Sequence, residues 1–521
     1  MALDICVDPD HGHNQPPTDN AWVTTYDSGR MDGACDVYTN VSNCSGSLPS
    51  CYNPSTHTGT CPYSYVNNGA PPTYGLVEPY FQIALNYGFA NWMFQTNQGP
   101  SFPAHQFLFS GTSAPTKPTD STTCEDSEGN KSSCYKWFDA ELTVPGTDPS
   151  GLYGCVAASG VQVLDIDPQT YEYTAWSPPW FSPPDAGFPC YDHNTLPDLL
   201  GDNNTGQPVS WRYYAWSGSQ GEGNLWDAPV AIEHICQNAV YGGQCQGPDW
   251  PSSRPYNGDI VLNPSQILTD LGANPNSVQC NLQQVSWVIP DGTWSDHPGI
   301  TGDDAGPSWV AAIVNAAGGY NNDGTATPGN CGYWPNTVIL VTWDDWGGWY
   351  DDVLPWNCDS SGLCSGYSNK TGGEYVYGFR VPLLVVSAWT PPGYVSGSSS
   401  QGVETPTPPY VHDFGSILNF TEWALGQNGN WLSLPGQQNL NLGISPSYSY
   451  ADYLAPDGPT CTTCNPKWSL ADFFLPFTTG LQRKFVQVTG WKYDTYYFLD
   501  PSEYFPNYPH APDDDAVDSQ D

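Results

Sequence analysis

The segment from Asn336 to Pro355, NTVILVTWDDWGGWYDDVLP, restricts the fold more than any other part of this chain. The run 338–341 is apolar and mostly β-branched, which predicts a strand covered on both faces. Asp344 and Asp345 follow at its carboxyl end. Ligand sites in open α/β sheets lie outside the carboxyl ends of strands, and adjacent carboxylates repel each other unless a cation or a shared proton holds them. The pair therefore indicates a metal site, with an Asp-rich turn that caps the next element as the alternative.

A second candidate group is the hydroxyl of Ser101, in the segment Gly-Pro-Ser-Phe-Pro at 99–103. The sequence predicts a stiff loop here, between a helix over about 79–94 and a second apolar stretch at 106–111. A serine held in such a loop can be aimed as a nucleophile or a metal ligand. The alternative is a serine that only satisfies a turn.

Two histidines also follow or begin predicted elements. His297, in Ser-Asp-His-Pro at 295–298, comes after a predicted strand at 285–289, and His412 precedes a predicted helix at 416–425. A single histidine is more often structural than catalytic. Several of them beside loops at strand ends favour a catalytic site.

Taken in their order along the chain, these segments resemble the bacterial phosphoesterases that include secreted phospholipases C and an acid phosphatase that inhibits the respiratory burst. The resemblance implies an α/β, alkaline-phosphatase-like fold, with a mostly parallel central sheet, helices on both faces and long disulfide-bearing insertions. The segments that carry it lie at 8–13, 29–33, 99–101, 195–200, 210–214, 295–298, 344–351, 377–387, 412 and 416–418.

The resemblance implies that Ser101 is a nucleophile that also touches a metal, and that Asp344 and Asp345 are metal ligands. A coordinated hydroxyl loses its proton more readily than a free one and is oriented for in-line attack on phosphorus. Carboxylates with a hydroxyl suit a divalent ion such as Ca²⁺, Mg²⁺, Mn²⁺ or Zn²⁺.

The resemblance also assigns roles to histidines. His11 and His297 would bind the phosphoryl oxygens or protonate the leaving alkoxide, and His193 is a further candidate for the same pocket. His412 and Asp296 would hold the ligands in place from behind. The sequence assigns no role to His13, His105 and His234, and it favours a solvated position for His57 and His510.

The chain departs from the family pattern in two places. Family members normally begin with a strand that ends in Glu-Asn-Arg-Ser/Thr, whose Glu and Asn complete the metal site, and no such segment lies before the Asp8 to His13 stretch. We therefore expect a central strand and two metal ligands to be missing from these 521 residues. The second departure is Asp352, where the family often has histidine after Tyr-Asp.

Composition bears on location and partners. The 17 cysteines lie at close spacings in polar loops, which fits disulfides in an oxidising compartment and predicts a secreted or periplasmic protein. No stretch of about 18 apolar residues would cross a membrane. The formal charge of −41 opposes binding to nucleic acid or to an anionic membrane. It also opposes a phosphorylated substrate, unless a cation or an acidic medium offsets it.

We expect one catalytic domain over residues 1–445 and a packed C-terminal extension over 446–521. The predicted activity is hydrolysis of a phosphate ester, either a small phosphomonoester or a phospholipid head group. One alternative is a catalytically impaired surface protein that binds glycan through its 22 Trp and 33 Tyr residues. Another is a sulfatase-like enzyme, which the missing Cys/Ser-x-Pro-x-Arg signature opposes.

Overall fold

The computed structural model describes just under half of the chain. These residues are 8–9, 21–31, 39–40, 52–53, 58–59, 77–111, 113, 138–143, 153–158, 161–166, 173–175, 189–190, 195–203, 205–215, 226–237, 244–250, 259–273, 279–290, 294–297, 306–320, 331–349, 351–356, 358, 367–368, 374–375, 377–396, 411–426, 432, 470, 472–474 and 482–488.

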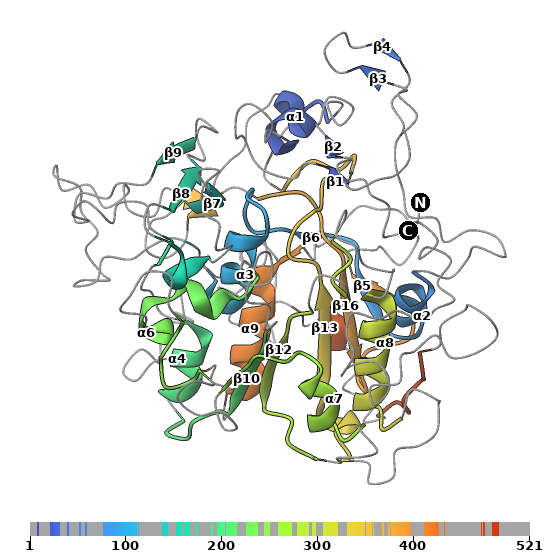
Figure 1. The fold of residues 1–521 in the computed structure, drawn as a ribbon. Helices are drawn as coiled ribbons and strands as arrows, with labels where there is room; N and C mark the ends of the chain where they lie inside the picture. Colours follow the sequence, from blue (N-terminus) through green and yellow to red (C-terminus); the bar gives the residue numbers. More distant parts are fainter. Residues whose placement is uncertain are drawn as a thin grey trace, which may run out of the picture.

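Helices and strands alternate along the described residues, as Figure 1 shows. The α-helices are α1 (Ala21–Tyr26), α2 (Glu78–Asn86), α3 (Ser101–Ser110), α4 (Leu196–Gly201), α6 (Glu233–Cys236), α7 (Gln266–Asp270), α8 (Gly306–Ala317) and α9 (Phe414–Leu425). The longer strands are β7 (Phe138–Thr143), β8 (Gln162–Ile166), β10 (Trp211–Tyr214), β12 (Val285–Val288), β13 (Val338–Thr342) and β16 (Leu383–Ser387). The short strands are β1 (Asp8–Pro9), β2 (Thr39–Asn40), β3 (Tyr52–Asn53), β4 (Thr58–Gly59), β5 (Gly88–Ala90), β6 (Met93–Phe94), β9 (Tyr173–Ala175), β11 (Ile260–Val261), β14 (Tyr367–Ser368), β15 (Glu374–Tyr375), β17 (Tyr394–Ser396) and β18 (His412–Asp413).

The largest described sheet has the strand order β13-β16-β5-β17 and is mixed, so the prediction of a mostly parallel sheet is not confirmed. β16 runs antiparallel to both β13 and β5, and only β17 and β5 are parallel. Thr342, the last residue of β13, pairs with Leu383, the first residue of β16. The chain therefore leaves one strand and enters its neighbour at the same end of the sheet, and that route forces the two strands to be antiparallel.

A second sheet, β11-β10-β12, is parallel throughout. The predicted strand at 285–289 is β12, and the predicted strand at 338–341 is β13. Among the described strands, parallel pairing is found in this three-stranded sheet and in the β5–β17 and β6–β18 pairs.

Helices cover both faces of the four-stranded sheet, as predicted. Alternate residues of a strand point to opposite faces. Leu384 and Val386 of β16 pack in a buried cluster with residues of α2 and α8, whereas Leu383 and Val385 pack in another cluster with residues of α3 and α9. Because both faces are covered, β16 is buried along its whole length and its sequence, LLVVS, is almost entirely apolar.

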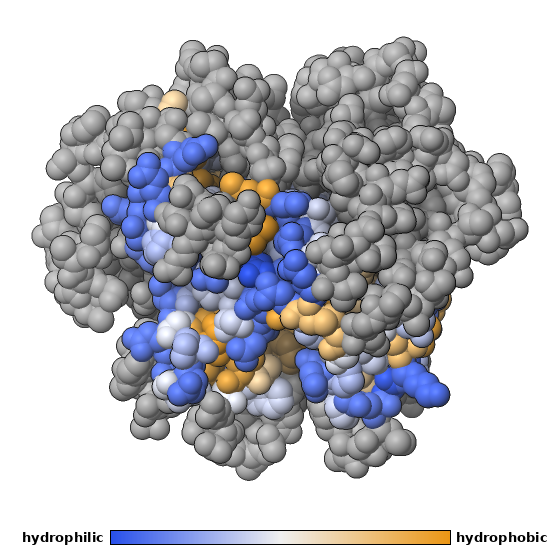
Figure 2. Space-filling model, turned by 60° about the horizontal axis from the view of Figure 1, so that its bottom comes forward, coloured by the Kyte–Doolittle hydropathy of each residue, from blue (hydrophilic) through white to orange (hydrophobic). Residues whose placement is uncertain are grey.

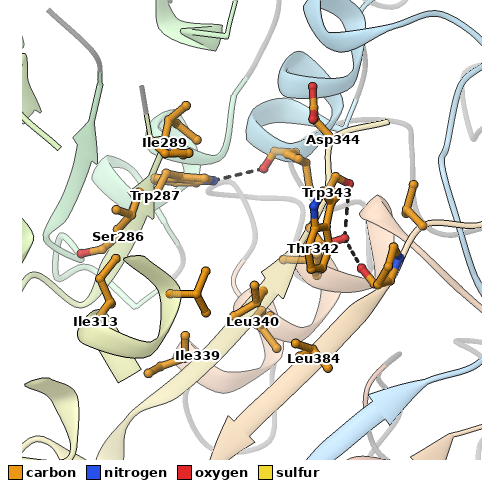
Figure 3. Close-up of a pocket in the computed structure, with 18 of the residues that line it drawn as sticks. Ser286, Trp287, Ile289, Ile313, Ile339, Leu340, Thr342, Trp343, Asp344 and Leu384 are labelled. Atoms are coloured by element: carbon orange, nitrogen blue, oxygen red, sulfur yellow. Dashed lines mark hydrogen bonds between the residues drawn. The ribbon is translucent and has the colours of Figure 1, made fainter. Parts of the chain in front are cut away.

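A cavity of about 1210 Å³ separates β12 from β13 (Figure 3). Ser286, Trp287 and Ile289 line one side, and Ile339 and Leu340 line the other. Among the described strands, β12 pairs only with β10 and β13 pairs only with β16, so the other edge of each strand has no partner strand. These edges border the cavity, and both strands are only half-buried. Figure 2 shows apolar residues reaching the surface among hydrophilic ones on the face turned forward there.

Of the two helices predicted from the sequence, one agrees closely with the structure and the other is shorter than predicted. The helix predicted at 416–425 is α9, which starts at Phe414 behind the N-cap Asp413. The helix predicted over about 79–94 ends at Asn86. The following residues form β5, which pairs with β16 and β17, and β6, which pairs with β18. Here the pairing of distant strands outweighs the local preference for a longer helix.

The described residues of the predicted C-terminal extension pack against the main core. Leu470, Phe473 and Phe474 belong to the same buried cluster as strands β5 and β6, and Val488 packs beside β16. The domain boundary at residue 445 stays a prediction, because residues 433–450 lie outside the described ones.

Three disulfides join described residues. They are Cys155–Cys190, Cys236–Cys245 and Cys280–Cys331. The second pair is one of the close spacings noted in the sequence. No helix in the described part of the chain is long and apolar enough to span a bilayer.

Candidate active site

Ser101 is the first residue of α3, so the predicted loop is in fact the start of a helix. Pro100 is the N-cap residue, and Gly111 ends the helix in a left-handed conformation with φ 72°. Proline is tolerated in the first turn of a helix, because the N–H groups there have no partner within the helix. Those same N–H groups and the helix dipole favour an anion at this end. The Gly-Pro-Ser-Phe-Pro segment therefore places a buried hydroxyl, 4% exposed, where a phosphoryl group is stabilised.

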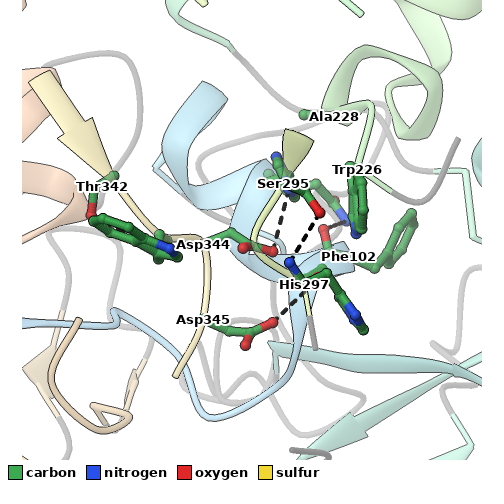
Figure 4. A network of polar contacts seen from close by, with 12 residues as sticks. Phe102, Trp226, Ala228, Ser295, His297, Thr342, Asp344 and Asp345 are labelled. Carbon is green, nitrogen blue, oxygen red and sulfur yellow. Dashed lines mark hydrogen bonds and ion pairs between the residues drawn. The ribbon is translucent and has the colours of Figure 1, made fainter. Parts of the chain in front are cut away.

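Asp345 connects this helix with the end of β13. Ser101 Oγ donates a hydrogen bond of 2.9 Å to Asp345 Oδ2, and the backbone N–H of Gly347 donates one of 2.7 Å to Asp345 Oδ1. Gly347 and Gly348 have φ values of 62° and 75°, which glycine adopts without strain. Asp345 thus supports the turn, as the alternative interpretation proposed, and also contacts the candidate nucleophile. Figure 4 shows both aspartates beyond Thr342, the last residue of β13.

Asp344 faces His105, which lies one helical turn beyond Ser101 on α3. The distance from Asp344 Oδ2 to His105 Nε2 is 3.3 Å. Burial raises the pKa of Asp344, but the attraction of His105, the hydroxyl of Ser101 and the charge of His297 outweigh burial and hold that pKa well below its usual range.

The segment after β12 brings His297 to the same place. The backbone N–H of His297 donates a hydrogen bond of 3.0 Å to Ser295 Oγ, and the imidazole ring lies 5.8 Å from the ring of Trp226. His297 and Asp344 line the same cavity, so the loops after β12 and β13 meet there. In Figure 4, Ser295, His297 and Trp226 surround the space in front of the two aspartates.

Asp296, between Ser295 and His297, has a positive φ of 63° and turns away from these neighbours. Its Oδ2 accepts a hydrogen bond of 2.6 Å from the Tyr80 hydroxyl of α2. Burial raises the pKa of Asp296 to about 7, and the hydrogen bonds from Tyr80 and Trp343 oppose that rise. Because Trp343 directly precedes Asp344, Asp296 joins the loop after β12 to the loop after β13. Its predicted role in holding the metal ligands stays a prediction.

His412 lies in a different environment from the one expected. Its Nε2 is 2.7 Å from Ser396 Oγ and 3.6 Å from Asp472 Oδ1, and the side chain is fully buried. These contacts join β18 to β17 and to the C-terminal extension. His11 and His193 lie outside the described residues, so their roles stay predictions.

The sequence left His105 without a role, although the structure places it at the site. Residues four apart lie on the same face of a helix. A helical interpretation of 101–110 would therefore have placed His105 beside Ser101. His234, also left open, lies 3.1 Å from Asp198 at a half-exposed position.

Comparison with known proteins gives this arrangement a context. A model of the phosphoesterase family matches residues 74–424, about two thirds of the chain. The chain belongs to the phosphoesterase family. All of the described site residues fall inside the match, and His11 precedes it.

Curated relatives with phospholipase C names match parts of the chain. A non-hemolytic phospholipase C of Pseudomonas aeruginosa is 26% identical over 163 residues, which are 28% of this chain and 20% of that protein. A non-hemolytic phospholipase C of Burkholderia pseudomallei is 31% identical over 27% of this chain and 19% of its own length. Phospholipase C A of Mycobacterium tuberculosis is 25% identical over 47% of this chain and 42% of its own length. The chain thus matches less than half of the length of these relatives.

The described residues at the site fit a divalent metal ion. Asp344 and Asp345 supply carboxylates and Ser101 supplies a hydroxyl, which are suitable donors for such an ion. The Oδ2 atom of Asp344 is buried and lies 3.3 Å from His105 Nε2. Within the described residues, no group of three or more His, Cys, Asp or Glu side chains is arranged to hold a metal by itself.

Proposed function

We propose that this protein hydrolyses phosphoric esters, with Ser101 as the nucleophile and a divalent metal ion held by Asp344, Asp345 and Ser101. The substrate is a small phosphomonoester or the head group of a phospholipid. Membership of the phosphoesterase family supports this class of reaction, and relatives named phospholipase C support it further.

The observation that carries the proposal is the contact between Ser101 and Asp345 at the start of α3. The Ser101 hydroxyl points its proton at Asp345 Oδ2, at a distance of 2.9 Å. A serine that only supported a turn would not require a buried carboxylate partner 244 residues away in the sequence. When bound, the metal would lower the pKa of the hydroxyl and reduce the charge repulsion between the anionic protein and a phosphate.

Each side chain of the site has its own role in the proposed reaction. Ser101 Oγ forms a bond to phosphorus as the bond from phosphorus to the leaving oxygen breaks. The N-terminus of α3 faces the phosphoryl oxygens. His297 protonates the leaving alkoxide or binds a phosphoryl oxygen, and the resemblance gives His11 and His193 the same roles. Water hydrolyses the resulting phosphoserine ester and regenerates Ser101.

We propose a secreted or periplasmic location for the protein. Three disulfides between described residues support an oxidising compartment. The acidic composition, with 53 Asp and Glu against 12 Lys and Arg, gives no support for nucleic acid as a partner.

Replacement of Ser101 by alanine tests the proposal. We expect Ser101→Ala to lower the turnover of p-nitrophenyl phosphate or phosphatidylcholine by roughly three orders of magnitude or more, because the covalent step is lost. The matched control is Ser110→Ala at the other end of α3, where a buried hydroxyl donates to the backbone oxygen of Gln106. Equal turnover of the two variants would refute the assignment of the nucleophile.

A further inference from the structure

Arg380 and Asp351 form a bidentate ion pair beside the candidate active site. Arg380 Nε donates a hydrogen bond of 2.6 Å to Asp351 Oδ2, and Arg380 Nη2 donates one of 2.7 Å to Asp351 Oδ1. The two side chains are 25% and 16% exposed, and both line the cavity that Asp344 and Asp345 also line. Two parallel hydrogen bonds between a guanidinium and a carboxylate fix the direction of the contact as well as its length.

The backbone of Arg380 lies beside β6. Arg380 forms an antiparallel bridge with Phe94, the last residue of that strand. Its Nη1 also donates a hydrogen bond of 3.2 Å to the carbonyl oxygen of Asn91, just before β6. The chain continues from β6 to Ser101 at the start of α3. The guanidinium is therefore fixed to the strand that leads to the candidate nucleophile.

Asp351 belongs to the loop after β13, which also carries Asp344 and Asp345. Between these aspartates and Asp351, the ring of Trp346 lies 4.7 Å from the ring of Phe379, the residue before the arginine. The loop after β13 thus contacts the segment before β16 at two points, which are the ring contact and the ion pair.

The charges of this region favour a cation beside the loop. Four aspartates lie within residues 344–352, and like charges so close together repel one another. Among the described residues that line the cavity, Arg380 is the only Lys or Arg. A partly exposed ion pair contributes little to the free energy of unfolding. The main effect of the pair is therefore on the position of the loop.

We propose that Arg380 and Asp351 are positioning residues, whose ion pair holds the loop after β13 against the strand that leads to α3 and so keeps Asp345 within hydrogen-bond distance of Ser101. The inference rests on the proposed function, in which Ser101 is the nucleophile. Ser101 Oγ lies 2.9 Å from Asp345 Oδ2. A shift of about 1 Å in such a contact can lower turnover by roughly 100-fold. Loss of the pair should therefore lower kcat more than it raises KM.

Two aspartates that are adjacent in the chain give a matched comparison. Asp351→Asn removes the ion pair, whereas Asp352→Asn removes the same charge at an exposed position. We expect Asp351→Asn to lower kcat for p-nitrophenyl phosphate by roughly 10–100-fold and to change KM by less than about threefold. Asp352→Asn should leave both constants within about twofold of the wild type. Equal losses of kcat in the two variants would show an effect of net charge and overturn the inference.

Arg380→Lys tests the geometry of the pair, because lysine keeps the charge but cannot make the bidentate contact. We expect kcat to fall as it does in Asp351→Asn. The double variant should lie within about twofold of the less active single variant, because the two side chains act as a unit. Losses that multiply in the double variant would mean that the residues act separately, against the inference.

Hydrogen exchange measured by mass spectrometry tests the positioning without substrate. We expect peptides that cover residues 344–349 to exchange at least about threefold faster in Asp351→Asn and in Arg380→Lys than in the wild type, and at the wild-type rate in Asp352→Asn. Unchanged exchange in the first two variants would overturn the inference, and so would unchanged kcat in a folded Asp351→Asn variant. The proposed function fails separately: faster exchange in both variants, with no phosphoester turnover by the wild type, would keep the positioning role and remove the hydrolase assignment.

Discussion

Asp296 is a carboxyl group that the fold keeps protonated over an unusual range of pH. Its pKa rises from 3.8 to about 7, because burial penalises the charge more than Tyr80 and Trp343 stabilise it. A carboxyl whose pKa is raised on folding contributes its stability below pH 3.8, and that contribution is lost as the pH rises through about 7. The contribution of Asp296 to the free energy of unfolding should therefore fall as the pH rises from 3.8 to about 7.

Asp296→Asn removes the titration but keeps an oxygen that accepts the hydrogen bond from Tyr80. We expect the melting temperature of the variant, relative to that of the wild type, to increase as the pH rises from 3.8 to about 7 and to level off above it. Differential scanning fluorimetry at a series of pH values measures this difference. A difference that is constant with pH would show that Asp296 keeps an ordinary pKa in the folded protein.

At the level of elements, the start of α8 packs tightly against the loop that carries His297. A Cβ atom added at Gly306 would lie 1.9 Å from Asp296 Oδ1. The loop after β12 would have to shift, and with it the side chains that Asp296 joins. Because Gly306 has no side chain, the loop that carries Asp296 and His297 can pack this closely against the start of α8.

We expect Gly306→Ala to destabilise the protein by about 1–3 kcal/mol, as overpacking of a core does, and to lower turnover as well. The control is Gly201→Ala in α4, where no atom lies within 4 Å of the added Cβ. Alanine there should be neutral or stabilising by up to about 1 kcal/mol. Urea unfolding curves of both variants provide the comparison. Equal midpoints would contradict the proposed contact between α8 and the loop.

Elements with strong local patterns could be predicted from the sequence, and those that depend on distant partners could not. The apolar run at 338–341 and the period of α9 are local signals, and both elements form. The segment at 99–103 contains Gly and two Pro residues and was predicted to be a loop, yet Pro100 is an N-cap and Ser101 begins a helix. That error also hid His105, because its position relative to Ser101 depends on the helix.

At the scale of the whole molecule, the mostly parallel sheet implied by the family resemblance is not confirmed. β16 and β13 are antiparallel because residues 343–382 return to the same end of the sheet, and no local pattern in that segment encodes the return. The sequence nevertheless predicted that the carboxylate pair, the serine and His297 share a site. Ligand sites in α/β sheets lie outside the carboxyl ends of strands, whatever the order of the strands.

The most direct test of the account is to capture the covalent intermediate on Ser101. The purified protein is mixed with p-nitrophenyl phosphate and a divalent metal, quenched in acid during turnover, digested and analysed by mass spectrometry. The account predicts a phosphoryl group on the peptide that contains Ser101, and no such group after metal is removed or in Ser101→Ala. Sustained turnover with this peptide unmodified, together with an active Ser101→Ala variant, would contradict it.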